Sequence, residues 1–166
     1  MKAEVDIINY GMGNLRSVEN AIIRLNFKPR IILSPDELDG SKKIILPGVG
    51  SFKAAMKLID EGGWANKIKK QVLDQKKPIF GICLGMQLLG TDSEEHGYSK
   101  GLNLIPGKIK YLKNLGCKNN LPQIGWNTVN ILKDHKYLKN VPNFNDFYFV
   151  NSYVFDLTNS KNLIGS

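Results

Sequence analysis

Apolar residues are spaced in two different ways along the first half of the chain. Short apolar runs occupy positions 4–8, 30–33, 43–46 and 78–82. The segments at 15–25, 52–59 and 64–73 instead carry apolar residues at helical spacing, and Asn14 stands where it can cap the first of them. Short buried strands that alternate with amphipathic helices predict an α/β fold, with an open, mostly parallel sheet flanked by helices.

The second half has longer apolar and aromatic runs, at 108–112, 123–132 and 147–155, separated by Gly, Asn and Pro residues. They predict strands in an antiparallel extension of the same sheet. No repeat, low-complexity tract or linker interrupts the chain, so residues 1–166 are expected to form a single domain. Residues 162–166 resemble the start of another strand, and we expect this domain to lack its C-terminal strands and closing helix.

Composition narrows the classes of function. The 166 residues are 42% hydrophobic and 23% charged, as in an ordinary globular domain. No apolar run reaches the roughly 18 residues of a membrane span, and Glu4 and Asp6 interrupt any signal peptide. We therefore expect a cytoplasmic protein without membrane contact. The net charge is +8, but the lysines are scattered and lack interleaved aromatics, so no nucleic-acid partner is expected. The basic cluster at 67–70 is predicted to line a solvated helix face.

The two cysteines, Cys83 and Cys117, need separate explanations. They form no C-x-x-C pair, and the chain has only two histidines, so neither a metal site nor a disulfide is predicted. No cofactor is expected. Cys117 follows Leu115 and Gly116 in a loop rich in lysine and asparagine, where we expect it to have no functional role.

Cys83 has a more informative setting. It lies in a G-x-C-x-G pattern, between the apolar run at 78–82 and a helical segment. This is the thiol counterpart of a nucleophile elbow, in which flanking glycines allow a sharp strand-to-helix turn. The thiol would stand at the carboxyl end of the sheet, and the helix N-terminus would favour the thiolate. The backbone N–H of Leu84 would then face an oxyanion formed on the substrate. A buried structural cysteine is the alternative interpretation.

Five segments together resemble one enzyme family. The segment 81–87 (GICLGMQ) resembles the nucleophile motif of class I (triad) glutamine amidotransferases. Segments 9–17 (NYGMGNLRS), 46–52 (LPGVGSF), 125–127 (GWN) and 147–153 (FYFVNSY) are similar to motifs of one branch, the glutaminase subunits of imidazole glycerol phosphate synthase. The resemblance runs from near the N-terminus to about Tyr153.

The resemblance implies a mechanism. The Cys83 thiolate would attack the side-chain amide of glutamine, giving a thioester and ammonia, and water would release glutamate. Ammonia would pass to a (β/α)8-barrel cyclase subunit that makes imidazole glycerol phosphate in histidine biosynthesis, so a heterodimer is expected. The implied site residues fall into three groups. The oxyanion donors are Val49, Gly50 and Leu84; the glutamine-binding residues are Gln87, Ser152 and Tyr153; the partner-facing residues are Gly11, Met12, Asn14, Arg16, Trp126 and Asn127.

The sequence departs from the family pattern at three places. Asn9 stands where Asp is usual, and Asn151 stands where His is frequent. The His-Pro-Glu motif that supplies the general base and its orienting carboxylate is absent. His96 and His135 lie in polar loops that do not match it, and neither is assigned this role.

These departures leave alternatives open. The chain is either part of a longer protein or a pseudoenzyme that binds glutamine or docks without hydrolysing it. A paralogous subunit that amidates a surface sugar is a further possibility. In either of the first two cases, the 166 residues alone are predicted to be inactive, because thiolate formation lacks its base.

Overall fold

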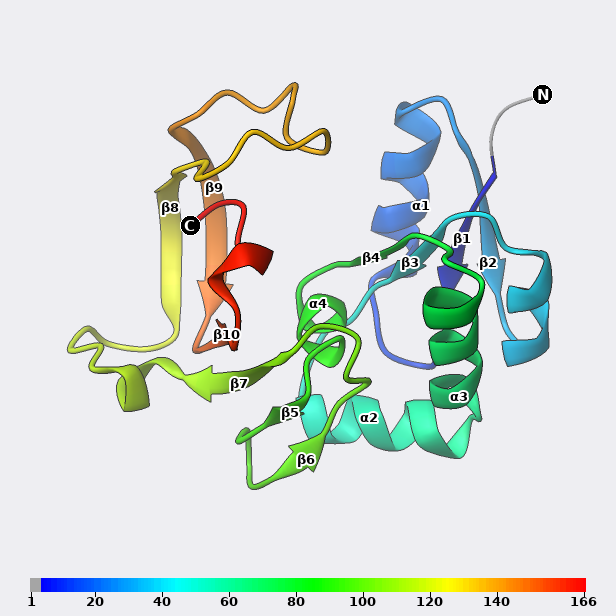
Figure 1. Cartoon of the computed structure of the whole chain (residues 1–166), viewed down its shortest axis with the longest axis horizontal. Helices are drawn as coiled ribbons and strands as arrows, with labels where there is room; N and C mark the ends of the chain where they lie inside the picture. The colour runs from blue at the N-terminus through cyan, green and yellow to red at the C-terminus, as the bar shows by residue number, and fades with distance from the viewer. Residues whose placement is uncertain (1–3) are drawn as a thin grey trace.

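The computed structural model describes residues 4–166 and places them in two connected regions (Figure 1). The first region is built on a four-stranded parallel sheet with the order β2-β1-β3-β4. Its strands are β1 (Glu4–Ile8), β2 (Lys28–Ile32), β3 (Ile44–Leu46) and β4 (Ile79–Gly81). The alternating pattern of the first half therefore gives the parallel sheet that it predicts.

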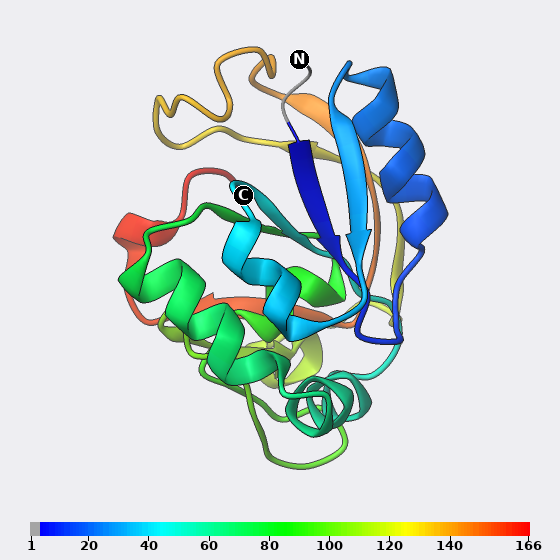
Figure 2. The same cartoon turned by 90° about the vertical axis from the view of Figure 1, so that its right-hand side faces the viewer.

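Helices cover both faces of this sheet. The helical elements of this region are α1 (Leu15–Arg24), α2 (Phe52–Glu61), α3 (Trp64–Lys69), η2 (Lys70–Asp74) and the 3-10 turn η1 (Pro35–Gly40). Figure 2 shows α1 on one side of β1 and β2 and α3 on the other. Successive residues of a strand pack into the cores on opposite faces of the sheet, because side chains alternate across a strand. Ile7 packs in the cluster of α1, whereas Ile8 packs in the cluster of α2 and α3.

Local signals explain where these helices begin. The Asn14 side chain accepts a hydrogen bond from the Ser17 N–H and caps α1, as predicted. The expected helix 64–73 changes at Lys70 into the π-helical turn η2.

The prediction of a solvated basic face is wrong for Lys67. Its ammonium group lies 3.0 Å from Asp36 and 2.8 Å from Asp39, and it joins α3 to η1.

The second half forms two sheets of its own. One has the order β10-β7-β5-β6, with β10 antiparallel to β7 and β5 antiparallel to β6. The other is the antiparallel hairpin of β8 and β9. The strands are β5 (Asp92–Ser93), β6 (Ser99–Lys100), β7 (Gly107–Tyr111), β8 (Gln123–Val129), β9 (Asn145–Asn151) and β10 (Tyr153–Leu157). Two short 3-10 turns, η3 (Leu112–Leu115) and η4 (Ser160–Asn162), complete this half.

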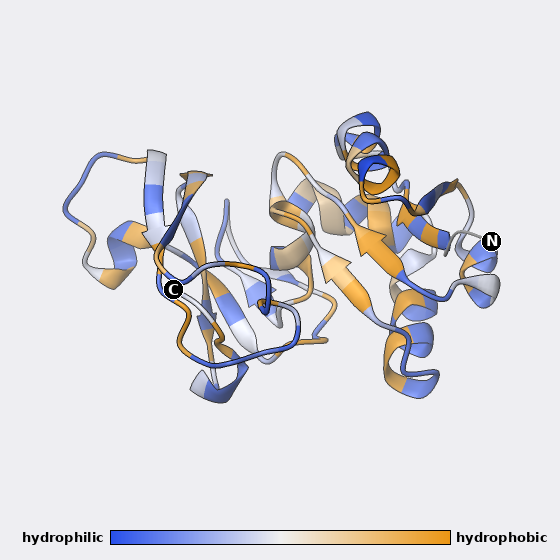
Figure 3. Ribbon diagram, turned by 90° about the horizontal axis from the view of Figure 1, so that it is seen from above, coloured by the Kyte–Doolittle hydropathy of each residue, from blue (hydrophilic) through white to orange (hydrophobic). Residues whose placement is uncertain are grey.

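Antiparallel strands in the second half are thus confirmed, but they pair with each other and not with the parallel sheet. The predicted strand 147–155 is two strands, β9 and β10, which separate at Ser152. The predicted strand 123–132 ends at Val129. Figure 3 shows the contrast between the two regions, since the parallel strands are strongly hydrophobic whereas the later strands mix both kinds of residue. Within residues 4–166, every helix is too short or too polar to span a bilayer.

Candidate active site

Cys83 occupies the turn between β4 and α4 (Leu84–Leu88). Its backbone has φ 54° and ψ −118°, in the region that residues with a side chain rarely adopt. The thiol is exposed. The sharp strand-to-helix turn expected from the G-x-C-x-G pattern is therefore present, and it holds the thiol at the carboxyl end of the sheet.

The two flanking glycines are required by close backbone approaches. A Cβ atom on Gly85 would lie 1.8 Å from the Leu46 carbonyl oxygen. A Cβ atom on Gly81 would lie 2.5 Å from the Met86 Cα atom. The Ile82 N–H donates to the Leu46 carbonyl at 3.0 Å, which ties the elbow to the end of β3. Any larger residue at 81 or 85 would therefore push α4 away from the sheet.

The loop 47–50 follows β3 and lies directly beside the elbow. A Cβ atom on Gly48 would lie 2.8 Å from the Gly85 nitrogen and 3.0 Å from the Leu84 Cβ atom. Gly50 has φ 100°, a conformation that glycine adopts without strain. In the part of the chain that the structure describes, the N–H groups of Val49, Gly50 and Leu84 donate to no other protein group. The structure thus brings the three sequence-predicted oxyanion donors into one neighbourhood with free N–H groups.

The predicted glutamine-binding residues come from two separate elements. Gln87 is half-buried on α4, one turn after Cys83, and its N–H donates to the Cys83 carbonyl at 3.3 Å. Ser152 separates β9 from β10, and its carbonyl accepts the Leu112 N–H at 3.0 Å. Tyr153 begins β10 and packs against the main core cluster, with its ring 5.2 Å from the Tyr111 ring.

Glu95 is a residue of this neighbourhood that sequence reasoning missed. Its carboxylate accepts the Phe52 N–H at 2.7 Å, where α2 begins directly after the oxyanion loop. A carboxylate at a helix N-terminus satisfies an otherwise unpaired donor and meets a favourable dipole. Burial and then the charge of Glu95 raise the pKa of the Tyr153 hydroxyl. Glu95 therefore joins the loop between β5 and β6 to the start of α2, and only its acidic character in a polar loop could have pointed to it.

The residues predicted to face a partner are all at least partly exposed. They lie in two places. The turn 11–13 packs on the oxyanion loop, since a Cβ on Gly50 would meet the Met12 Cε atom at 2.8 Å, and a Cβ on Gly13 would meet the Pro47 Cγ atom at 3.3 Å. Trp126, with 71% of its surface exposed, instead packs on Tyr148 across the β8–β9 hairpin. The two sets are on different elements, and the turn 11–13 is the one that touches the oxyanion loop.

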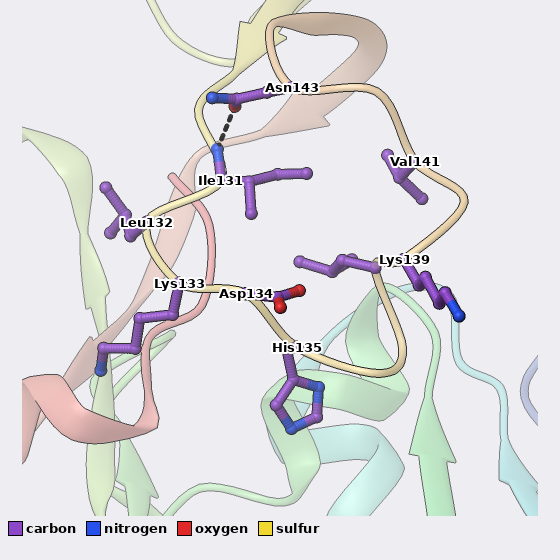
Figure 4. A pocket seen from close by; sticks show the side chains of 9 residues that line it. Ile131, Leu132, Lys133, Asp134, His135, Lys139, Val141 and Asn143 are labelled. Carbon is purple, nitrogen blue, oxygen red and sulfur yellow. Dashed lines mark hydrogen bonds between the residues drawn. The ribbon is translucent and has the colours of Figure 1, made fainter.

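A candidate base for Cys83 is not found among the histidines. His96 is exposed in the loop between β5 and β6. His135 packs at a tilt of 52° against Tyr137, with ring centres 4.9 Å apart, and lines an open hollow of about 350 Å³ in the loop 131–143 (Figure 4). None of the residues that line this hollow is a predicted site residue. Within residues 4–166, neither histidine forms a hydrogen bond with Cys83.

Residues 6–164 match the family described as glutamine amidotransferase class-I. The chain belongs to this family. The expectation from the motifs is therefore confirmed, and the family is one of enzymes.

Curated relatives of this class I amidotransferase chain are similar over most of its length. It is 44% identical over 149 residues to the imidazole glycerol phosphate synthase subunit HisH of Desulfitobacterium hafniense, covering 90% of this chain and 69% of that protein. It is 39% identical over 162 residues to the subunit of the same name from Leptospira borgpetersenii, covering 96% and 79%.

Solved structures share the amidotransferase fold at low sequence identity. The structure of PurLQS from Thermotoga maritima matches with a TM-score of 0.71 at 18% identity, over 99% of this chain and 74% of that one. A crystal structure of a glutamine amidotransferase matches with a TM-score of 0.69 at 18% identity, over 91% and 72%. The predicted fold class, a parallel sheet with helices and later antiparallel strands, is confirmed.

Proposed function

We propose that this chain is the glutaminase subunit of imidazole glycerol phosphate synthase and acts in histidine biosynthesis. The observation that carries this proposal is the position of Cys83, which is held with φ 54° in a strand-to-helix turn that packs against the loop 47–50. Within residues 4–166, the N–H groups of Val49, Gly50 and Leu84 donate to no protein group. The names of the relatives, which are 39–44% identical, supply the pathway. The surface-sugar alternative has no comparable support.

The chemistry follows from the geometry. The Cys83 sulfur would attack the side-chain carbonyl carbon of glutamine and form a tetrahedral oxyanion. The N–H groups of Val49, Gly50 and Leu84 would donate to that oxygen. Collapse breaks the C–N bond, releases ammonia and leaves a thioester, which water hydrolyses to glutamate and the free thiol. Gln87, Ser152 and Tyr153 would hold the glutamine.

The ammonia would pass to a (β/α)8-barrel cyclase subunit. The exposed turn 11–13 contacts the oxyanion loop, so a partner bound there would touch the segment that carries two of the oxyanion donors. We infer that Gly11, Met12, Asn14 and Arg16 form one part of this interface, and that Trp126 and Asn127 form another.

The general base is the element that these 166 residues do not supply. A thiol needs a neighbouring base to transfer its proton in each catalytic cycle. We therefore infer that the 166 residues alone turn over glutamine negligibly, although they can bind it and react once with an electrophile.

This distinction sets the experiment. The chain is incubated with the chloromethyl ketone analogue of glutamine, and the modified residue is located by mass spectrometry. We expect modification of Cys83 that excess glutamine prevents, and none at position 83 in Cys83→Ala. The matched control is Cys117→Ala, in which modification should proceed as in the unchanged chain. Modification that glutamine does not prevent would contradict the proposed glutamine site.

A further inference from the structure

Tyr10 follows β1 and carries a buried hydroxyl without a partner. Only 5% of its surface is exposed, and it belongs to the main core cluster. Within residues 4–166, its hydroxyl oxygen forms no hydrogen bond. A buried polar group without a partner destabilises the folded state, and native proteins rarely keep one. The hydroxyl therefore calls for an explanation beyond packing, because phenylalanine would fill the same space.

The hydroxyl faces the oxyanion loop. A Cβ atom on Gly48 would lie 2.8 Å from the Tyr10 hydroxyl oxygen, on the side where it would also lie 2.8 Å from the Gly85 nitrogen. The Gly48 backbone is thus packed between the Tyr10 hydroxyl and the first turn of α4. Burial, and then the neighbouring Cys83, raise the pKa of the Tyr10 hydroxyl to about 12. The group therefore stays protonated near neutral pH and remains a hydrogen-bond donor.

An unused acceptor lies next to this unused donor. In the described part of the chain, the Gly48 carbonyl accepts no hydrogen bond. The carbonyl of residue 48 and the N–H of Val49 belong to one planar trans peptide, so they point in opposite directions. If the Gly48 carbonyl turns toward the Tyr10 hydroxyl, the Val49 N–H must therefore turn in the opposite direction, away from that hydroxyl. Glycines at 48 and 50 give this peptide the freedom to rotate.

We propose that Tyr10 is a positioning residue for the oxyanion loop, whose hydroxyl donates to the Gly48 carbonyl and so aims the Val49 N–H at the oxyanion on Cys83-bound glutamine. This inference rests on the proposed glutaminase function and adds a residue to it. Tyr10 acts through the loop and touches neither the substrate nor the sulfur.

The test compares two reactions of Cys83 in Tyr10→Phe, a change that removes only the oxygen atom. In the chloromethyl ketone analogue, a chloromethyl group replaces the side-chain amino group of glutamine. Attack of the Cys83 thiolate on this ketone forms an oxyanion, before the thioether forms and chloride leaves. Alkylation by iodoacetamide also forms a thioether, with loss of iodide, but forms no oxyanion. The first reaction depends on the loop and the thiolate, whereas the second depends on the thiolate alone. Tyr137→Phe, at an exposed tyrosine of the loop 131–143, is the matched control.

For Tyr10→Phe we expect the chloroketone reaction to slow by roughly three- to tenfold, as for loss of one neutral hydrogen bond. The iodoacetamide rate and its pH profile should not change, and the melting temperature should stay equal or rise. An unchanged chloroketone rate would overturn the inference. Parallel loss of both rates would also overturn it, because the hydroxyl would then act on the thiol or the packing. Failure of the proposed function is seen separately, as a lack of protection by glutamine in the unchanged chain.

Discussion

At the scale of single residues, the site depends on places where a side chain is absent. The sequence pattern G-x-C-x-G was enough to predict the elbow, because its chemistry depends on neighbours in the chain. It could not reveal that Gly85 lies against the Leu46 carbonyl or that Glu95 caps α2, since both contacts join segments far apart in sequence. The unpartnered hydroxyl of Tyr10 is likewise visible only in the folded chain.

Substitution of Gly85 by alanine should destabilise the whole domain. The added Cβ would meet the Leu46 carbonyl oxygen at 1.8 Å, and backbone must shift to relieve the overlap. We expect the free energy of unfolding to fall by about 3 kcal/mol or more. Gly40→Ala is the control, because a Cβ atom there meets nothing within 4 Å. Urea denaturation of both variants measures the difference, and equal stability would contradict the close approach.

The buried carboxylate of Asp6 on β1 makes the free energy of unfolding depend on pH in the acid range. Burial by itself would raise the pKa of Asp6, but Arg30 donates two hydrogen bonds, at 2.7 and 2.9 Å, that hold this pKa below its ordinary value of 3.8. The folded state therefore binds the proton more weakly than the unfolded state. The stabilisation is complete above about pH 4 and is lost as the pH falls through the lowered folded pKa.

Asp6→Asn should remove this acid-dependent stability. At pH 7 we expect the free energy of unfolding to fall by about 1–3 kcal/mol, because Arg30 loses a charged partner. Glu61→Gln, which alters an exposed pair with Lys57 at 3.8 Å, should change it by less than about 1 kcal/mol. Denaturant titrations between pH 3 and 7 measure both variants. If the free energy of unfolding of Asp6→Asn still falls with pH below pH 4 as steeply as in the unchanged chain, another group is responsible.

At the scale of elements, the two halves differ in how well sequence predicts them. The strands and helices of the parallel sheet follow from periodicity, because β1 and β3 are buried on both faces and form short apolar runs between amphipathic helices. The later strands were found, but their partners were not. β10 pairs with β7 more than 40 residues earlier, and a strand pattern does not encode which strand lies beside it. The break at Ser152 was missed because apolar and aromatic residues resume directly after the two polar residues Asn151 and Ser152.

The β8–β9 hairpin should be the most easily opened strand pair of the molecule. Its register places Ile124, Trp126, Tyr148 and Val150 on one face, and each is more than half exposed. A two-stranded ribbon with one exposed apolar face has little packing to support it and is marginally stable. We expect its amides to exchange with deuterium at least tenfold faster than those of β1 and β3. Hydrogen exchange with mass spectrometry measures this, and equal protection would contradict it.

At the scale of the whole molecule, the two tryptophans occupy opposite environments. Trp64 has 3% of its surface exposed inside the main core, whereas Trp126 has 71% exposed on the hairpin. In Trp64→Phe, fluorescence therefore reports on Trp126 alone. This separation allows the proposed partner interface to be tested without a label.

Addition of the cyclase subunit to Trp64→Phe should shift the emission of Trp126 to shorter wavelength and reduce its quenching by acrylamide. Burial of an indole ring removes it from water, which causes both effects. A cyclase variant without tryptophan keeps the signal specific, and Trp126→Phe in the same background is the blank. Binding detected by sedimentation with no change in emission would place Trp126 outside the interface.

The backbone at Cys83 also has a consequence for how variants of this protein would be selected. A residue with a side chain is strained at φ 54° and ψ −118°, whereas glycine is not. A screen for cellular abundance should therefore enrich Cys83→Gly, while a screen for reaction with the chloromethyl ketone analogue of glutamine should remove it. The two screens would disagree at position 83 and agree at position 85, and that contrast would separate residues kept for chemistry from residues kept for folding.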